Sequence, residues 1–221
     1  MSTPTNTPTN TPIETDDERT PDGRRARRAR GRLAVTQAMI DLVFEGHLPP
    51  TTEEIAERAG VSVASLFRYF DTLDDLRRDT TERYFDRYAH LFEIVDIGEG
   101  PLAERVDRFV DARATLYETT EPMCRLVRVR AHEVDAVSDM VSLVIASRAD
   151  QIRHHFDLEL SAMTLAAAED ATAVISTVTS FESWDQMCHI LDRSHAEVRR
   201  AWAGVLQQIF RPSPHPPGAA T

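Results

Sequence analysis

The stretch TTEEIAERAGVSVASLFRYF, residues 51–70, carries the signals of two short helices joined by a tight turn. Thr51 and Glu54 have capping-box spacing, in which each side chain bonds to the other residue's backbone N–H at a helix start. Gly60 ends this helix, because glycine adopts a left-handed conformation at little cost. Ser62 then caps the next helix, so the stretch predicts a helix-turn-helix.

A third helix precedes this stretch and completes a three-helix unit. One apolar stripe at helical spacing is formed by Val35, Ala38, Met39 and Leu42. Gly46 stops this helix, and Leu66 and Phe70 of the last helix are expected to face inward.

Beyond residue 70 the pattern stays helical, and no alternating strand pattern competes. A fourth helix is expected from Leu76 to Val95, and a fifth from Leu102 until Pro122 ends it. Further helices are expected at Met123–Val134, Val137–Phe156, Leu165–His189 and Ser194–Phe210. The sequence therefore predicts an all-α fold of about nine helices, with an N-terminal three-helix domain followed by a C-terminal helical bundle domain.

The composition divides the chain into four parts. Residues 1–23, with a TPTN repeat, and the proline-rich residues 212–221 are predicted to be disordered tails. Residues 24–72 form an Arg-rich arm and the helix-turn-helix domain, and residues 73–211 form the second domain. The net charge of -11 would disfavour nucleic acid, but residues 22–70 hold eight Arg against six acidic residues. We expect the arm to be flexible and to reach the minor groove of DNA.

Residues 51–70 resemble the helix-turn-helix of the TetR family of bacterial transcription regulators, and the resemblance extends over residues 32–76. It rests on Gly46, the IAERAGVS core and the Leu-Phe-Arg-Tyr-Phe end of the recognition helix. The resemblance implies a homodimeric repressor whose N-terminal domain binds a palindromic double-stranded DNA operator and whose C-terminal domain dimerises and holds a small-molecule effector. Activation instead of repression stays open.

A recognition helix enters the major groove with its first turn toward the base edges. The residues expected to contact DNA are Arg24, Arg25, Arg27, Arg28, Arg30, Thr51, Thr52, Val63, Ala64, Ser65, Phe67, Arg68 and Tyr69. The chain departs from the family at Leu73, where a phosphate-binding Lys is usual, and Asp74 and Asp75 follow it. We expect the Arg-rich arm to compensate for this weaker binding to phosphate.

The second domain is expected to hold an effector and a partner subunit. The predicted effector pocket, for an unidentified lipophilic or aromatic small molecule, comprises Tyr88, Phe92, Phe109, Tyr117, Met123, Arg128, His132, Met140 and Trp184. Apolar stripes on the last two long helices predict a dimer interface of Ala167, Ala171, Val174, Ile175, Val178, Val198, Trp202, Val205 and Ile209.

No catalytic constellation competes with this interpretation. His132-Glu133 lacks the second His of a zinc protease, and Cys188-His189 lacks a third catalytic member. We expect no enzyme activity, cofactor, metal or membrane partner, and the two distant cysteines favour a reducing cytoplasm. The alternative is a helical interaction or enzyme module with a vestigial helix-turn-helix, which would show no DNA binding in a gel shift.

Overall fold

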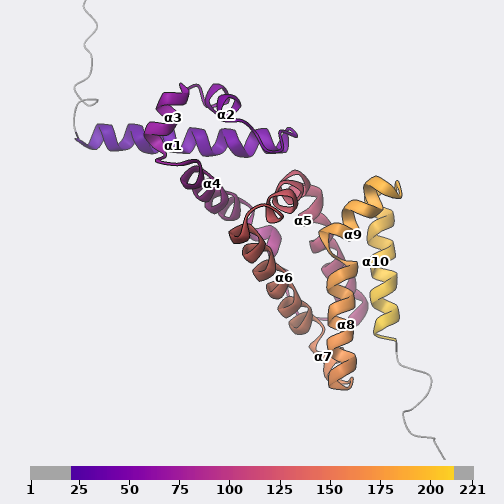
Figure 1. Cartoon of the computed structure of the whole chain (residues 1–221). Coiled ribbons are helices and arrows are strands. Elements are labelled where there is room, and N and C mark those ends of the chain that lie inside the picture. Colours follow the sequence, from indigo (N-terminus) through magenta and orange to yellow (C-terminus); the bar gives the residue numbers. More distant parts are fainter. Residues whose placement is uncertain (1–20, 212–221) are drawn as a thin grey trace, which may run out of the picture. The chain divides into compact units, whose positions relative to one another are not determined.

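The computed structural model describes residues 21–211 (Figure 1). Its elements are α1 Pro21–Phe44, α2 Thr52–Arg58, α3 Val63–Tyr69, α4 Leu73–Tyr88, η2 Ala89–Phe92, α5 Leu102–Ala131, α6 Asp135–His155, α7 Asp157–Ser161, α8 Leu165–Val178, α9 Phe181–Asp185, η3 Gln186–Ile190 and α10 His195–Ile209. No strand occurs in this range, and the all-α prediction is confirmed. None of these helices combines the length and apolar composition that crossing a membrane requires. The predicted tails, apart from residues 21–23 of α1, lie outside the described residues.

The described chain divides into two compact units. The first comprises residues 21–40 and 51–80, and the second comprises residues 41–50 and 81–211. The boundary within α4 follows Thr80, beyond the position 72 expected from the sequence, because the first turns of α4 pack with the first unit. In that unit Leu66 and Phe70 are fully buried, as predicted.

Two expected boundaries are wrong because tertiary packing outweighs local signals. Pro122 lies inside α5 instead of ending it, since the buried face continues from Tyr117 on one side to Met123 on the other. The helix expected over Leu165–His189 is interrupted after Val178. There the Tyr117 hydroxyl donates a hydrogen bond of 3.0 Å to the Thr179 carbonyl.

The fourth helix is also shorter than expected. It ends at Tyr88 and η2 follows, so Val95 lies outside any helix and is 71% exposed. The predicted last helix is confirmed as α10, which Ser194 and Glu197 start with a capping box.

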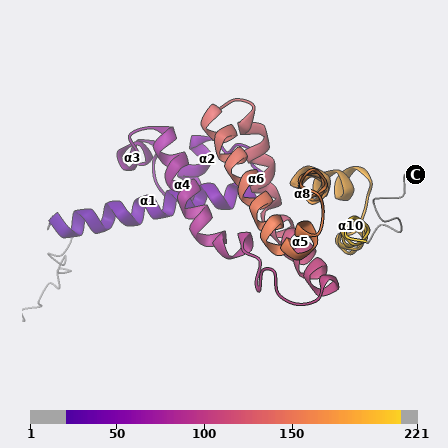
Figure 2. The ribbon, with the colours of Figure 1, turned by 90° about the horizontal axis from the view of Figure 1, so that it is seen from below.

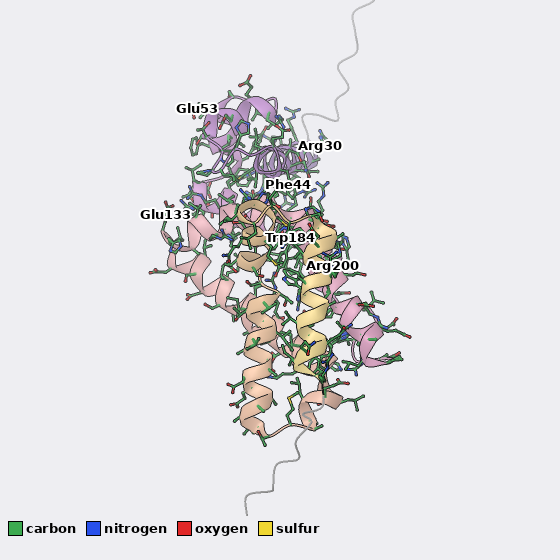
Figure 3. All side chains as sticks on the ribbon, turned by 90° about the vertical axis from the view of Figure 1, so that its right-hand side faces the viewer. Arg30, Phe44, Glu53, Glu133, Trp184 and Arg200 are labelled. Carbon is green, nitrogen blue, oxygen red and sulfur yellow. The ribbon has the colours of Figure 1, made fainter. Side chains whose placement is uncertain are left out.

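The core of the second unit is built around α5. The largest fully buried side chains there are Arg105, Phe109, Arg113, Leu116, Tyr117, Phe156, Trp184 and Trp202. Figures 1 and 3 show α8 and α10 side by side, and Figure 2 shows α6 beside α5. Two of these buried residues are arginines, whose charges need partners inside the protein.

Arg105 has such partners. Its Nη1 donates hydrogen bonds of 2.7 Å to the His155 carbonyl and 2.8 Å to Glu159 Oε2, and its Nε donates one of 3.0 Å to the Gly100 carbonyl. The Arg105 side chain is 2% exposed and that of Glu159 is 16% exposed. The pair therefore ties the loop before α5 to α6 and α7.

Replacing Arg105 with Met should lower the free energy of unfolding by about 3–5 kcal/mol, because the largely buried Glu159 carboxylate would lose its cation. Chemical denaturation monitored by helicity measures this change. Arg153→Met is the control, because Arg153 forms an exposed pair with Asp150 and should have little effect. An equal, small effect of both substitutions would contradict a structural role for Arg105.

Candidate functional site

The helix-turn-helix has the predicted caps. The Thr51 backbone N–H donates to Glu54 Oε2 at 2.7 Å, and the Glu54 N–H donates to Thr51 Oγ1 at 3.3 Å. Gly60 has φ +69°, the left-handed conformation expected at the turn. The Ser65 N–H donates to Ser62 Oγ at 3.1 Å. At the start of each helix a backbone N–H group thus bonds to a side chain three residues earlier. For α3 this side chain is that of Ser62, which fixes where the helix begins.

The recognition helix α3 presents a mixed surface. Ala64, Phe67 and Arg68 are exposed, whereas Val63, Ser65 and Tyr69 are half-buried. Arg68 Nη2 donates a hydrogen bond of 3.1 Å to Ser65 Oγ, so its guanidinium lies along the helix surface. At the start of α2, Thr51 is exposed and Thr52 is half-buried. The unit therefore offers an apolar side chain, a hydroxyl and a guanidinium group from one short helix.

The Arg-rich segment is not a flexible arm, contrary to the sequence prediction. Residues 24–32 lie within α1, because Ala and Arg are strong helix formers and Pro21 suits the first helical position. Arg24, Arg25, Arg27, Arg28 and Arg30 are all exposed on this helix. Arg24 and Arg28 are one turn apart and share a face with Gly31, whereas Arg25 and Arg30 point to other sides.

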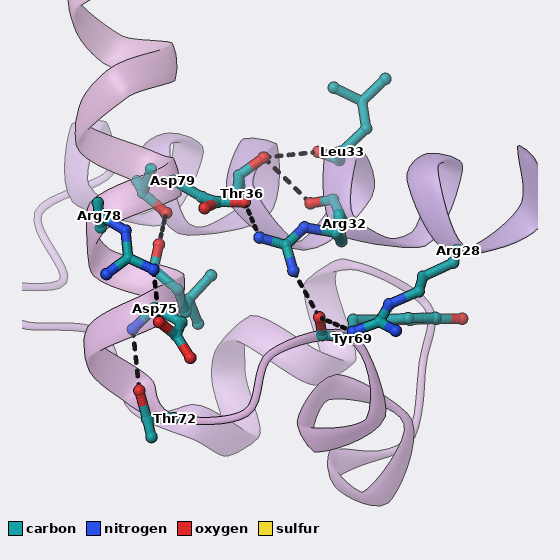
Figure 4. Close-up of polar contacts among 11 residues, drawn as sticks. Arg28, Arg32, Leu33, Thr36, Tyr69, Thr72, Asp75, Arg78 and Asp79 are labelled. Atoms are coloured by element: carbon teal, nitrogen blue, oxygen red, sulfur yellow. Dashed lines mark hydrogen bonds and ion pairs between the residues drawn. The ribbon is translucent and has the colours of Figure 1, made fainter. Parts of the chain in front are cut away.

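Gly31 contacts the recognition helix. A Cβ atom at this position would lie 2.4 Å from Cζ of Tyr69, so the Tyr69 ring lies directly against the α1 backbone. Arg32 Nη1 donates a hydrogen bond of 2.7 Å to the Tyr69 carbonyl, and its Nη2 pairs with Asp79 of α4 (Figure 4). The Arg32 guanidinium also lies 4.4 Å from the centroid of the Phe70 ring. The face of α1 that carries Arg24 and Arg28 therefore continues to the point where α1 contacts the end of α3.

The acidic residues at the start of α4 have arginine partners. Asp74 pairs with Arg77 at 2.7 Å, and Asp75 pairs with Arg78 at 2.5 Å. The hydrogen bond from Arg78 lowers the pKa of Asp75 below its ordinary value. These pairs offset part of the negative charge that the sequence places beside α3.

Two adjoining cavities lie in the second unit. The larger, of about 280 Å³, is lined by Tyr84, Phe85, Phe92, Met123, Cys124, Val127, Arg128, Ala131, His132, Met140, Val141, Val144, Ile145, Arg148, Phe181 and Glu182. The smaller, of about 210 Å³, is lined by Phe92, Arg113, Met140, Leu143, Val144, Ser147, Arg148 and Gln151. The two share Phe92, Met140, Val144 and Arg148, and their walls are mainly apolar.

The structure brings five of the predicted pocket residues to the larger cavity: Phe92, Met123, Arg128, His132 and Met140. The other four lie elsewhere. Phe109, Tyr117 and Trp184 are fully buried in the core, and Tyr88 stacks on Phe44. Sequence reasoning did not single out Arg113, Arg148 or Gln151, because only the packing of α5 against α6 brings them together.

The predicted dimer residues fall on both sides of α8 and α10. Ala171, Ile175, Val198 and Trp202 face the core of the protomer. Ala167, Val174 and Val205 are exposed, and Val178 and Ile209 are half-buried.

Comparison with known proteins agrees with this geometry. Residues 49–79 match the family model of bacterial regulatory proteins of the tetR family. No curated protein sequence matches the chain. The fold is similar to that of a transcriptional regulator from Rhodococcus sp. Rha1, with a TM-score of 0.59, 16% identity and coverage of 82% of this chain and 96% of that one.

A second similar structure is a putative transcriptional regulator from Streptomyces coelicolor A3(2), with a TM-score of 0.52, 19% identity and coverage of 82% of this chain and 98% of that one. At these identities the likeness shows a shared fold. Residues 49–79 match the helix-turn-helix of bacterial regulatory proteins of the tetR family, and this match supports a transcriptional regulator of that type.

Proposed function

We propose that this regulator is a homodimeric repressor in the cytoplasm that binds a near-palindromic operator and is released by a small-molecule effector. The observation that carries the proposal is the capped α3 with exposed Ala64, Phe67 and Arg68. Its first turn can contact thymine methyl groups, and Arg68 can donate to a base edge or a phosphate. A two-fold dimer would present two such helices to half-sites about 34–36 Å apart.

The outer faces of α8 and α10 support the dimer. Leu165, Val174 and Val205 are 77%, 46% and 38% exposed. Gly204 is also exposed, and a Cβ atom there would meet no other atom within 4 Å. Small and apolar side chains at this surface allow two helix pairs to pack closely.

The helix α4 supports coupling between effector and operator. Its residue Asp79 pairs with Arg32 in the first unit, and its residues Tyr84 and Phe85 line the larger cavity in the second. A ligand that favours one position of α4 would shift the population only by its differential affinity for the two states. We expect the effector to weaken DNA binding by a factor of about 5–150.

Replacing Arg68 with Ala should weaken specific binding to DNA from upstream of the protein's own gene about 5- to 150-fold, because one good base contact contributes about 1–3 kcal/mol. Fluorescence anisotropy with specific and scrambled duplexes measures the change. Arg153→Ala removes one equally charged group from the surface of α6 and should leave the affinity unchanged. Unaltered specific binding by the Arg68 variant would contradict the assignment of α3 as the recognition helix.

The positions of the arginines around α1 predict which of them determine the salt dependence of DNA binding. Replacing Arg24 and Arg28 with Ala should flatten the slope of log affinity against log salt by about 0.9 for each phosphate that the variant no longer neutralises. The matched control replaces Arg25 and Arg30, which removes the same charge from other sides of α1 and should flatten the slope less. Equal flattening by both pairs would show that α1 contributes only diffuse charge, and no flattening by either would show that it does not contact DNA.

A further inference from the structure

We propose that the effector is an organic acid, whose apolar body occupies the larger cavity and whose anionic group lies between Arg148 and Arg113. This inference rests on the proposed effector-binding function and narrows the effector to one chemical class. Its basis is a pair of cations at the cavity wall without an acidic partner.

Arg148 lines both cavities and has unused hydrogen-bonding capacity. Its Nη1 donates a hydrogen bond of 2.9 Å to the Tyr117 hydroxyl, and its guanidinium lies 5.3 Å from the centroid of the Tyr117 ring. The Arg148 Nε is buried and makes no hydrogen bond within the described structure. A carboxylate has two oxygens that accept from such a planar group in parallel.

Arg113 lies at the wall of the smaller cavity and has only neutral partners. The residue is 2% exposed. Its Nη2 donates a hydrogen bond of 2.7 Å to Gln151 Oε1, and its guanidinium lies 5.0 Å from the centroid of the Phe109 ring. Burial, together with the like charge of Arg148, lowers the pKa of Arg113 to about 10. The group is therefore still charged at neutral pH.

Three other arginines near the core of this unit have acidic partners. Arg105 pairs with Glu159, and Arg125 and Arg128 both pair with Asp185. Among residues 21–211, no Asp or Glu lies within 4.0 Å of the guanidinium of Arg113 or Arg148. Keeping two cations close together in a partly dry site is costly unless an anion joins them. A bound acid would supply that anion.

The cavity walls specify the rest of the molecule. Tyr84, Phe85, Met123, Val127, Met140 and Val144 surround the larger cavity. Aromatic rings and flexible Met side chains adapt to an aromatic or aliphatic body. Glu182 contributes a carboxylate to this cavity beside Arg128, with which it pairs at 3.7 Å. An anionic group is disfavoured there, so the acid should point toward Arg148.

Isothermal titration calorimetry of the full chain without DNA tests this inference with two probes of nearly equal shape, 2-naphthaleneacetate and 2-naphthaleneacetamide. The acid should bind at least about tenfold more tightly than the amide, because the amide cannot form charge-assisted hydrogen bonds. Arg148→Gln should reduce this preference, measured as the ratio of the two affinities, toward the part that Arg113 supplies, whereas Arg148→Lys should keep more of it. Arg153→Gln, on the same helix, should alter neither affinity.

Circular dichroism establishes that each variant keeps its helicity, and wild-type discrimination between acid and amide tests the inference without any variant. Equal affinity of the two probes would overturn it. If neither probe binds, and decanoate and decanamide do not bind either, the inference is also overturned. Operator binding is measured separately by anisotropy. If the amide releases the operator as effectively as the acid does, the inference is refuted but the proposed function is not. If the acid binds tightly and leaves the operator affinity unchanged, the effector role is refuted.

Discussion

One guanidinium group, that of Arg32, joins three helices of the DNA-binding unit. From α1 it bonds to the carbonyl of Tyr69 at the end of α3, pairs with Asp79 of α4 and lies over the ring of Phe70. A planar group with donors on several edges can make all of these contacts at once, which an ammonium group cannot. Gly31, the preceding residue, leaves the space that the Tyr69 ring fills. The direction of α3 relative to the α1 backbone depends on this junction.

Arginine is the sole strongly basic residue type in the chain, and its partners decide its role. Arg32 and Arg105 have acidic partners and stabilise the fold. Arg24 and Arg28 are exposed on α1, where Arg28 Nη2 also donates a hydrogen bond of 3.5 Å to the Tyr69 carbonyl, and we propose that both contact phosphate. Arg113 and Arg148 line a cavity with neutral partners only, so their charges favour an anionic ligand. We therefore propose that the same residue type serves stability, DNA affinity or ligand selection according to its surroundings.

The helix-turn-helix could be predicted from the sequence because its determinants are local. Thr51, Gly60 and Ser62 specify their caps and turn within four residues, and the structure confirms each. The sequence predictions are wrong where contacts between residues far apart in the chain determine the structure. Pro122 is a helix terminator by local rules, yet the continuous buried face of α5 carries the helix past it. Arg113 of α5 and Arg148 of α6 line the same cavity, and no spacing within either helix indicates that they do.

Photo-crosslinking most directly tests whether α3 lies in the major groove of an operator. A benzoylphenylalanine replaces Ala64 in the full chain, or Val129 in the second unit as a control, and each protein is irradiated on a duplex selected by the wild-type chain from a random library. The proposed function predicts crosslinks from position 64 to bases in two symmetric half-sites, and none from position 129. Absence of base crosslinks from position 64 on a duplex that still binds, or equal crosslinking from both positions, would contradict it.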